Sequence, residues 1–149
     1  MKRDGQITAF YFETLLLIVV FLLIILVLTQ VFGLARQQSA AARQLTDAVT
    51  LAGNAAEAVS ISADPAELFA LLNENGNAEE LPDASGVRAC YNDEKNPDPQ
   101  GAYCVEVSWQ PEKTARGTMV SSVIQVRHGA SEKPVYSLET ASFREEGAP

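Results

Sequence analysis

The feature that most constrains this chain is an uninterrupted apolar segment near the N-terminus. Residues 14–35 read TLLLIVVFLLIILVLTQVFGLA and include no charged side chain. As a helix, a segment of this length spans roughly 30 Å, which is the thickness of the hydrocarbon core of a bilayer, and its backbone polar groups are satisfied internally. A small soluble domain cannot bury such a helix on every face. We therefore predict a transmembrane helix over residues 14–35.

The charges that flank this helix predict its orientation. Lys2 and Arg3 lie in the short segment 1–13 before it, whereas the chain as a whole carries a net charge of −8. Because short flanking segments rich in Lys and Arg stay on the cytoplasmic side, we expect a cytoplasmic N-terminus, a single pass through the cell membrane and an exterior domain over residues 36–149. Arg36, at the far boundary, opposes this orientation.

A cleaved signal peptide is the alternative interpretation of the same segment. Gly33, Leu34 and Ala35 provide small residues near a possible cut. However, the apolar run is longer than the roughly 7–15 residues that such peptides use, and the sequence beyond it continues in a helical pattern.

The helix is predicted to continue beyond the membrane over residues 36–62. This stretch is rich in alanine, contains no proline and has apolar residues at spacings of three and four, which indicates one apolar helical face. The residues of that predicted face are Leu45, Val49, Ala52, Ala56 and Val59. Asp64 and Pro65 then form a helix-start signal for a short second helix over residues 65–74.

The remainder of the exterior domain carries the pattern of strands. Four stretches are rich in β-formers and are separated by turn residues: 87–91, 102–110, 118–128 and 135–143. In the second stretch Tyr103, Val105, Val107 and Trp109 alternate with more polar residues, which is typical of a sheet with one buried face. The fold class predicted is α+β: a long N-terminal helix packed on a small four-stranded antiparallel sheet that covers residues 87–143.

The two cysteines, Cys90 and Cys104, fall on the first two predicted strands. If these strands pair as a hairpin, the thiols come close enough for a disulfide, which an exterior location permits. Two buried free thiols are the alternative. A zinc site is disfavoured because no second pair of ligands accompanies the cysteines and His128 is the only histidine.

Motifs for catalysis are absent from the sequence, so we expect a protein that is not an enzyme and uses no cofactor. His128 is interpreted as a surface residue at a strand end rather than a base. Residues 92–98 gather side-chain oxygens that suit calcium, but the segment lacks the glycine and distant glutamate of a hand-type site, so a solvated turn is preferred. The acidic balance argues against nucleic-acid binding by the exterior domain.

Glu13 is a carboxylate at the entrance of the apolar segment, directly after the aromatic residues 10–12. A charge at this position is costly unless it lies at the membrane interface or is paired. Two interpretations follow: an interfacial carboxylate beside an aromatic belt, or a partner for an amine on a neighbouring subunit.

Taken together, these features resemble the type IV pilin superfamily, which includes minor pilins and the pseudopilins of type II secretion systems; Tad-type pseudopilins are a close variant. The resemblance rests on a basic leader ending at Gly5, an apolar helix with a glutamate near its start, a long helix that runs into an exterior sheet, and a cysteine pair. It implies cleavage between Gly5 and Gln6 by a prepilin peptidase, methylation, an assembly role for Glu13, and partners that are other pilin-like subunits and the assembly machinery.

The processing motif departs from the family pattern. Family members place the glutamate fifth after the cut, whereas Glu13 is the eighth residue after Gly5, and a cut after Thr8 lacks the glycine. Either cleavage leaves an offset glutamate, or the chain is not processed.

Two functions are therefore considered. The first is a non-enzymatic assembly subunit of a type IV pilus or type II secretion-like filament. The second is a single-pass membrane protein with an exterior domain that binds a ligand or partner.

Overall fold

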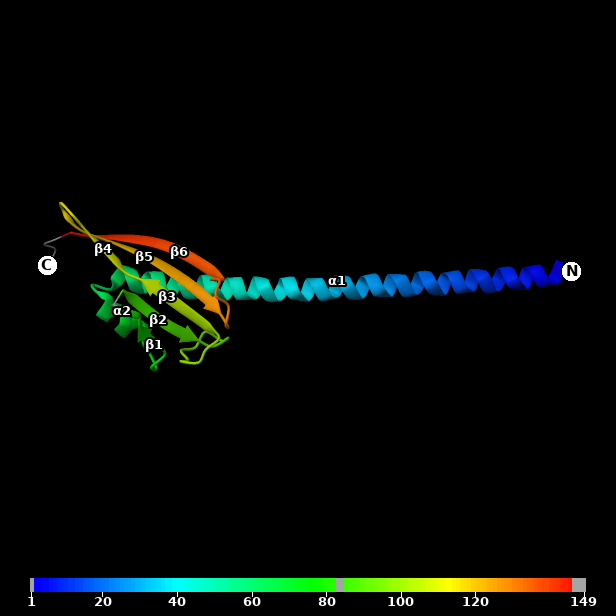
Figure 1. The fold of residues 1–149 in the computed structure, drawn as a ribbon, viewed down its shortest axis with the longest axis horizontal. Coiled ribbons are helices and arrows are strands. Elements are labelled where there is room, and N and C mark those ends of the chain that lie inside the picture. Colours follow the sequence, from blue (N-terminus) through cyan, green and yellow to red (C-terminus); the bar gives the residue numbers. More distant parts are fainter. Residues whose placement is uncertain (1, 83–84, 146–149) are drawn as a thin grey trace. The chain divides into compact units, whose positions relative to one another are not determined.

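The computed structural model describes residues 2–82 and 85–145, and the side chains of residues 9–82 and 85–144. The chain divides into two compact units, Met1–Ala42 and Arg43–Pro149. Helix α1 (Lys2–Ile61) begins in the first unit and ends in the second (Figure 1). A continuous helix agrees with the sequence, because no proline interrupts it and the predicted continuation over residues 36–62 is present to within one residue.

The second helix, α2 (Pro65–Leu72), starts as its sequence signal predicts. Asp64 is the N-cap, and its carboxylate accepts a hydrogen bond of 2.8 Å from the backbone N–H of Glu67. The carboxylate of Glu67 in turn accepts from the backbone N–H of Ala63, so two backbone donors at the helix start are satisfied reciprocally. The helix ends at Leu72, slightly before the predicted end.

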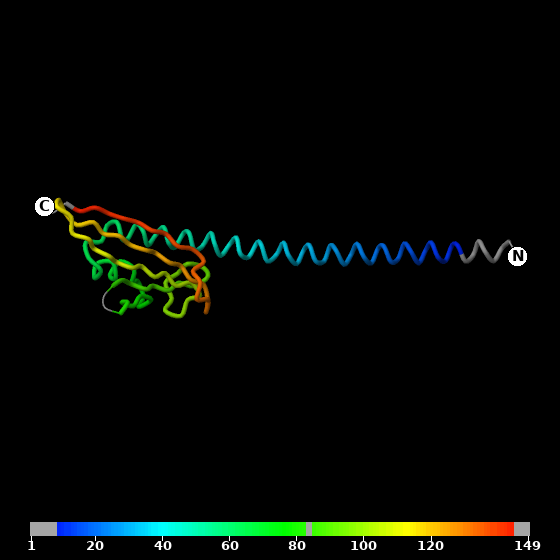
Figure 2. Tube along the Cα trace, turned by 45° about the horizontal axis from the view of Figure 1, so that its top comes forward, coloured from blue at the N-terminus to red at the C-terminus, as the bar shows by residue number. Residues whose placement is uncertain are grey.

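The sheet is antiparallel and contains six strands, two more than the sequence pattern indicates. The four expected strands appear as β2 (Gly86–Tyr91), β3 (Tyr103–Ser108), β5 (Gly117–His128) and β6 (Tyr136–Glu145). They pair in chain order, and β6 lies beside β5 along most of its length (Figure 2). The additional strands are β1 (Ala78–Glu80), which pairs with β2, and β4 (Gln110–Thr114), which pairs with β5.

Strands β3 and β4 pair, one after the other, with the same side of β5. Val107 pairs with Ile124 of β5, and Gln110 pairs with Ser121, so the register of β5 is the same on both sides of the break. At the break, the backbone N–H of Trp109 donates to the carbonyl of Ser85, which continues the register of the β2–β3 pairing. The sequence pattern missed β4 because all five of its side chains are exposed, and an exposed strand shows no apolar alternation.

A single hydrophobic core joins α1, α2 and the inner face of the sheet in the second unit. The predicted alternation of β3 is confirmed, with Tyr103, Val105, Val107 and Trp109 buried. The predicted apolar face of α1 is partly wrong, because Leu45 and Val49 are 46% and 44% exposed. The buried stripe is rotated toward small side chains, which let the helix approach the sheet closely; its members are Ala48, Leu51, Ala52, Ala55 and Val59.

Candidate assembly surfaces

The apolar part of α1 exposes its side chains on every face of the first unit. Large apolar side chains from Phe10 to Leu34 are between 44% and 70% exposed. Their segment reaches a mean hydropathy of 3.2, and in the part of the chain that the structure describes α1 is the one helix long and apolar enough to cross a membrane. The predicted transmembrane helix therefore has the length and composition that a bilayer requires.

The two threonine hydroxyls within this segment are satisfied by the helix itself. The hydroxyl of Thr14 donates to the carbonyl of Phe10 at 2.9 Å, and the hydroxyl of Thr29 donates to the carbonyl of Ile25 at 2.8 Å. Because both donors are used locally, neither requires water or a neighbouring chain. Apart from the amide of Gln30, the surface that residues 14–35 offer to their surroundings is thus apolar.

Glu13 lies on α1 with an exposed side chain, one residue before Thr14. No ion pair involves it within residues 9–82 and 85–144. The residues of the predicted processing site, Gly5 and Gln6, lie within α1. The side chains that the structure describes begin at residue 9, after this site. The interfacial and the intermolecular interpretation of Glu13 both stay predictions.

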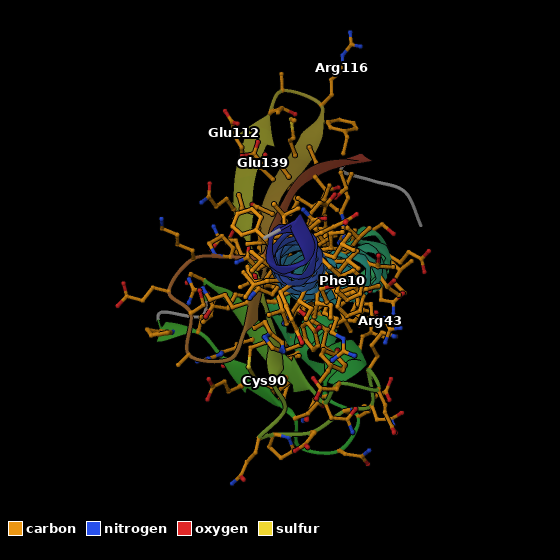
Figure 3. The ribbon with its side chains drawn as sticks, turned by 90° about the vertical axis from the view of Figure 1, so that its right-hand side faces the viewer. Phe10, Arg43, Cys90, Glu112, Arg116 and Glu139 are labelled. Carbon is orange, nitrogen blue, oxygen red and sulfur yellow. A yellow bond between two sulfur atoms is a disulfide. The ribbon has the colours of Figure 1, made fainter. Side chains whose placement is uncertain are left out.

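In the second unit a disulfide joins Cys90 of β2 to Cys104 of β3, which stand opposite each other in the register of the hairpin. Their Cα atoms are 4.1 Å apart. Figure 3 marks Cys90 on the sheet. The bridge closes the segment that connects the two strands, so the conformation of that connection is constrained at its base.

The loop inside the disulfide is folded as a turn that contacts α1. The side-chain oxygen of Asn92 accepts hydrogen bonds of 3.0 Å from the backbone N–H groups of Glu94 and Asn96, so it serves the turn. Lys95, whose φ is +65°, reaches Asp47 of α1 and pairs with its carboxylate at 2.8 Å. The hydrogen bond to Asp47 raises the pKa of Lys95. The oxygen-rich loop therefore contacts α1 through a partly exposed ion pair.

His128 is the last residue of β5, as the strand-end interpretation expects. Its imidazole is half-buried against the ring of Tyr103, with centroids 4.5 Å apart, and its Nε2 lies 3.7 Å from a carboxylate oxygen of Asp93. Burial, followed by the charges of Asp47 and Asp93, raises the pKa of Tyr103. Asp93 of the disulfide loop thus lies near the end of β5.

A groove opens in the second unit between α1, α2 and the end of β2. Its volume is about 370 Å³, and its apolar lining includes Leu51, Ile61, Leu71 and Leu72. Polar residues also line it: Asn54, Glu57, Glu74, Tyr91 and Lys95. Burial, followed by the carboxylate of Glu74, raises the pKa of Tyr91, so its hydroxyl stays protonated well into the alkaline range.

Sequence reasoning located the apolar segment and the cysteine pair but missed the groove and the Lys95–Asp47 contact. Both depend on residues that are distant in the chain, since Asp47 and Lys95 are separated by 48 positions. The available signal was weak: a lysine within an otherwise acidic turn, whose charge favours a carboxylate partner.

Comparison of the chain with family models, with curated proteins and with solved structures found no match. The architecture itself, a long apolar N-terminal helix with an antiparallel sheet and a disulfide, is compatible with that of pilin-like proteins.

Proposed function

We propose that this chain is a non-enzymatic, membrane-anchored subunit of a pilin-like filament, either a type IV pilus or a type II secretion-like filament. One observation carries the proposal. Large apolar side chains are exposed on all sides of α1 between Phe10 and Leu34, and the same helix supplies part of the core of a disulfide-bonded sheet domain in the second unit. A simple anchor needs only the first of these two parts.

In this proposal the cell membrane stores the apolar part of α1 before assembly. The N-terminus is cytoplasmic and the second unit is exterior, where its disulfide is stable. On assembly the exposed apolar side chains exchange lipid for the helices of neighbouring pilin-like subunits. Because lipid tails are as apolar as leucine, that exchange is driven by close packing and polar contacts rather than by the hydrophobic effect.

Glu13 is the polar contact that the proposal assigns to assembly. In the filament its carboxylate pairs with the amino terminus of a neighbouring subunit, which offsets the cost of a charge in an apolar environment. The amine is created when a prepilin peptidase cleaves after Gly5 and leaves Gln6 as the methylated first residue.

Mass spectrometry of the N-terminus tests the processing step. The protein purified from membranes of its own host is expected to begin at Gln6 with a methylated amine. An intact Met1 in all of the protein contradicts processing after Gly5.

Substitution of Glu13 tests the assembly role. Glu13→Gln is expected to leave membrane insertion unchanged and to abolish association of subunits measured by cross-linking in the membrane. Glu132→Gln, which removes an exposed carboxylate in the second unit, is the matched control. Equal association of the two variants contradicts the role of Glu13.

The groove of about 370 Å³ favours a second candidate function, an exterior domain that binds a ligand or partner. This candidate requires no subunit association through α1. It predicts that Glu13→Gln has little effect on binding of the ligand or partner and that substitutions in the groove abolish this binding.

A further inference from the structure

The groove between α1 and α2 carries two carboxylates that hold no cation within the described part of the chain. Glu57 of α1 and Glu74, just after α2, both line it and both are exposed. Lys95, the one cation in the lining, is paired with Asp47. The groove therefore combines an apolar floor with an uncompensated negative charge, which suits a cationic side chain with a long aliphatic stem.

Four of the eight described Lys and Arg side chains in the second unit are already engaged, Lys95 among them. Arg88 and Arg127 pair with glutamates on the sheet, and Arg144 lies over the ring of Trp109. The other four, Lys113, Arg116, Lys133 and Arg43, make no ion pair in the described residues, and of these only Arg43 lies on α1, with an exposed side chain (Figure 3). It is an arginine, whose planar guanidinium matches carboxylates better than lysine does.

The positions of Arg43 and Glu57 on α1 are complementary between two copies of the chain. They are 14 residues apart in sequence, which is close to four helical turns, so they lie within about 40° of each other around the helix and about 21 Å apart along it. A second copy with its helix parallel to the first, shifted by this length and turned so that the two faces oppose each other, places its Arg43 beside Glu57 of the first. In this arrangement the same face of α1 is used by both copies, and the contact fixes the axial offset between two neighbouring helices.

We propose that the groove binds Arg43 of a second copy of this chain, with the guanidinium between Glu57 and Glu74 and the aliphatic stem over Ile61 and Leu71. This inference rests on the proposed function and adds a partner and a register to it. The carboxylates are exposed, so each pair contributes little energy by itself. Its effect is to select one offset between neighbouring helices, because other offsets leave the charges unpaired.

Cysteine cross-linking in membranes measures that offset while leaving Arg43 and Glu57 intact. Two differently tagged full-length copies are co-expressed, one with Ala40→Cys and the other with Asn54→Cys, which are exposed positions on α1 separated by the same 14 residues. Because the described native cysteines are paired in the disulfide, the added thiols are the reactive ones. Mild oxidation is expected to give the mixed dimer.

The matched control replaces Asn54→Cys by Ser60→Cys, which is exposed on a different face of α1. Its mixed dimer is expected to be at least roughly fivefold weaker, since the thiols are then on different sides of the helix. Equal cross-linking of the two pairs overturns the proposed offset.

Charge reversal identifies the interacting groups. Arg43→Glu in both copies, or Glu57→Arg in both copies, is expected to reduce the Ala40–Asn54 cross-link by roughly fivefold, and the double variant to restore it. Arg116→Glu, at the exposed turn between β4 and β5, is the matched single reversal and is expected to have no effect (Figure 3). Failure of the double variant to recover the cross-link overturns the Arg43–Glu57 contact.

The outcomes separate this inference from the proposed function. If Glu13→Gln abolishes all association but charge reversal changes nothing, the filament proposal stands and the groove contact is wrong. If neither substitution affects association, both are wrong.

Discussion

Removal of the disulfide should cost the second unit about 3 kcal/mol, and the structure specifies why. Cys90 and Cys104 are separated by 14 positions, and a closed loop of about 15 residues lowers the entropy of the unfolded chain by an amount worth about 3 kcal/mol at 25 °C. Both side chains are only half-buried, on the outer face of the sheet, so replacing them with alanine removes little packing. The loss is therefore expected to come through the unfolded state.

The assay uses Trp109, which is the only tryptophan, is 7% exposed and belongs to the core. Its fluorescence reports unfolding of the second unit in urea while the full chain is held in detergent micelles. The double variant Cys90→Ala/Cys104→Ala should lower the free energy of unfolding by about 3 kcal/mol and increase the denaturant slope, since the unfolded chain becomes more expanded.

Reduced wild-type protein is the control for this prediction. It lacks the bridge but keeps both side chains, so it should match the double alanine variant to within about 0.5 kcal/mol. A loss below about 1 kcal/mol in both proteins would refute the loop-closure argument. A large loss in the alanine variant alone would assign the effect to packing.

Three further perturbations test other parts of the structure by the same fluorescence assay. Gly86→Ala should destabilise the second unit by about 2 kcal/mol or more, because the added Cβ would collide with a carbonyl of β3. Gly53→Ala, in α1, should stabilise it by about 0.5–1 kcal/mol, because the added Cβ meets nothing within 4 Å. Equal effects of the two substitutions contradict this. Ile124→Ala, at a fully buried position, should cost about 2–5 kcal/mol, and a cost near zero would show that the core lies elsewhere. Folding raises the pKa values of Tyr91 and Lys95 above their ordinary values of 10.0 and 10.5. The free energy of unfolding should therefore be highest below about pH 10 and fall as the pH rises through the raised values. A free energy of unfolding that stays constant between pH 9 and 12 argues against the Lys95–Asp47 contact and the burial of Tyr91.

Local sequence patterns predicted those features whose cause is local. The N-cap at Asp64 follows from residues within one helical turn of it, and the burial of Val105 and Val107 follows from strict alternation along a strand. The pairing of Cys90 with Cys104 was within reach because a hairpin connects them directly. Strand β4 was out of reach, because its polar residues are ordered by the β5 edge they pair with rather than by burial of their own.

Helix α1 shows the same division within a single element. The apolar run of residues 14–35 by itself determined that this part of the chain forms a helix with an apolar surface on every side, since no charged residue or helix breaker interrupts it. The sequence did not determine which face of the continuation packs on the sheet. Leu45 and Val49 are the more hydrophobic residues, yet Ala48 and Ala55 are buried, because small side chains permit close approach of helix and sheet.

Tertiary structure also decided where the charges of the second unit are compensated. Asp47 and Lys95 meet because the disulfide loop folds back on α1, and Glu57 and Glu74 are left together in a groove because α2 packs beside the same helix. Each of these juxtapositions joins residues far apart in the chain. Hydrophobic periodicity reports only which residues leave water, whereas the pairing of surface charges depends on the packing of whole elements, which the three-dimensional fold alone provides.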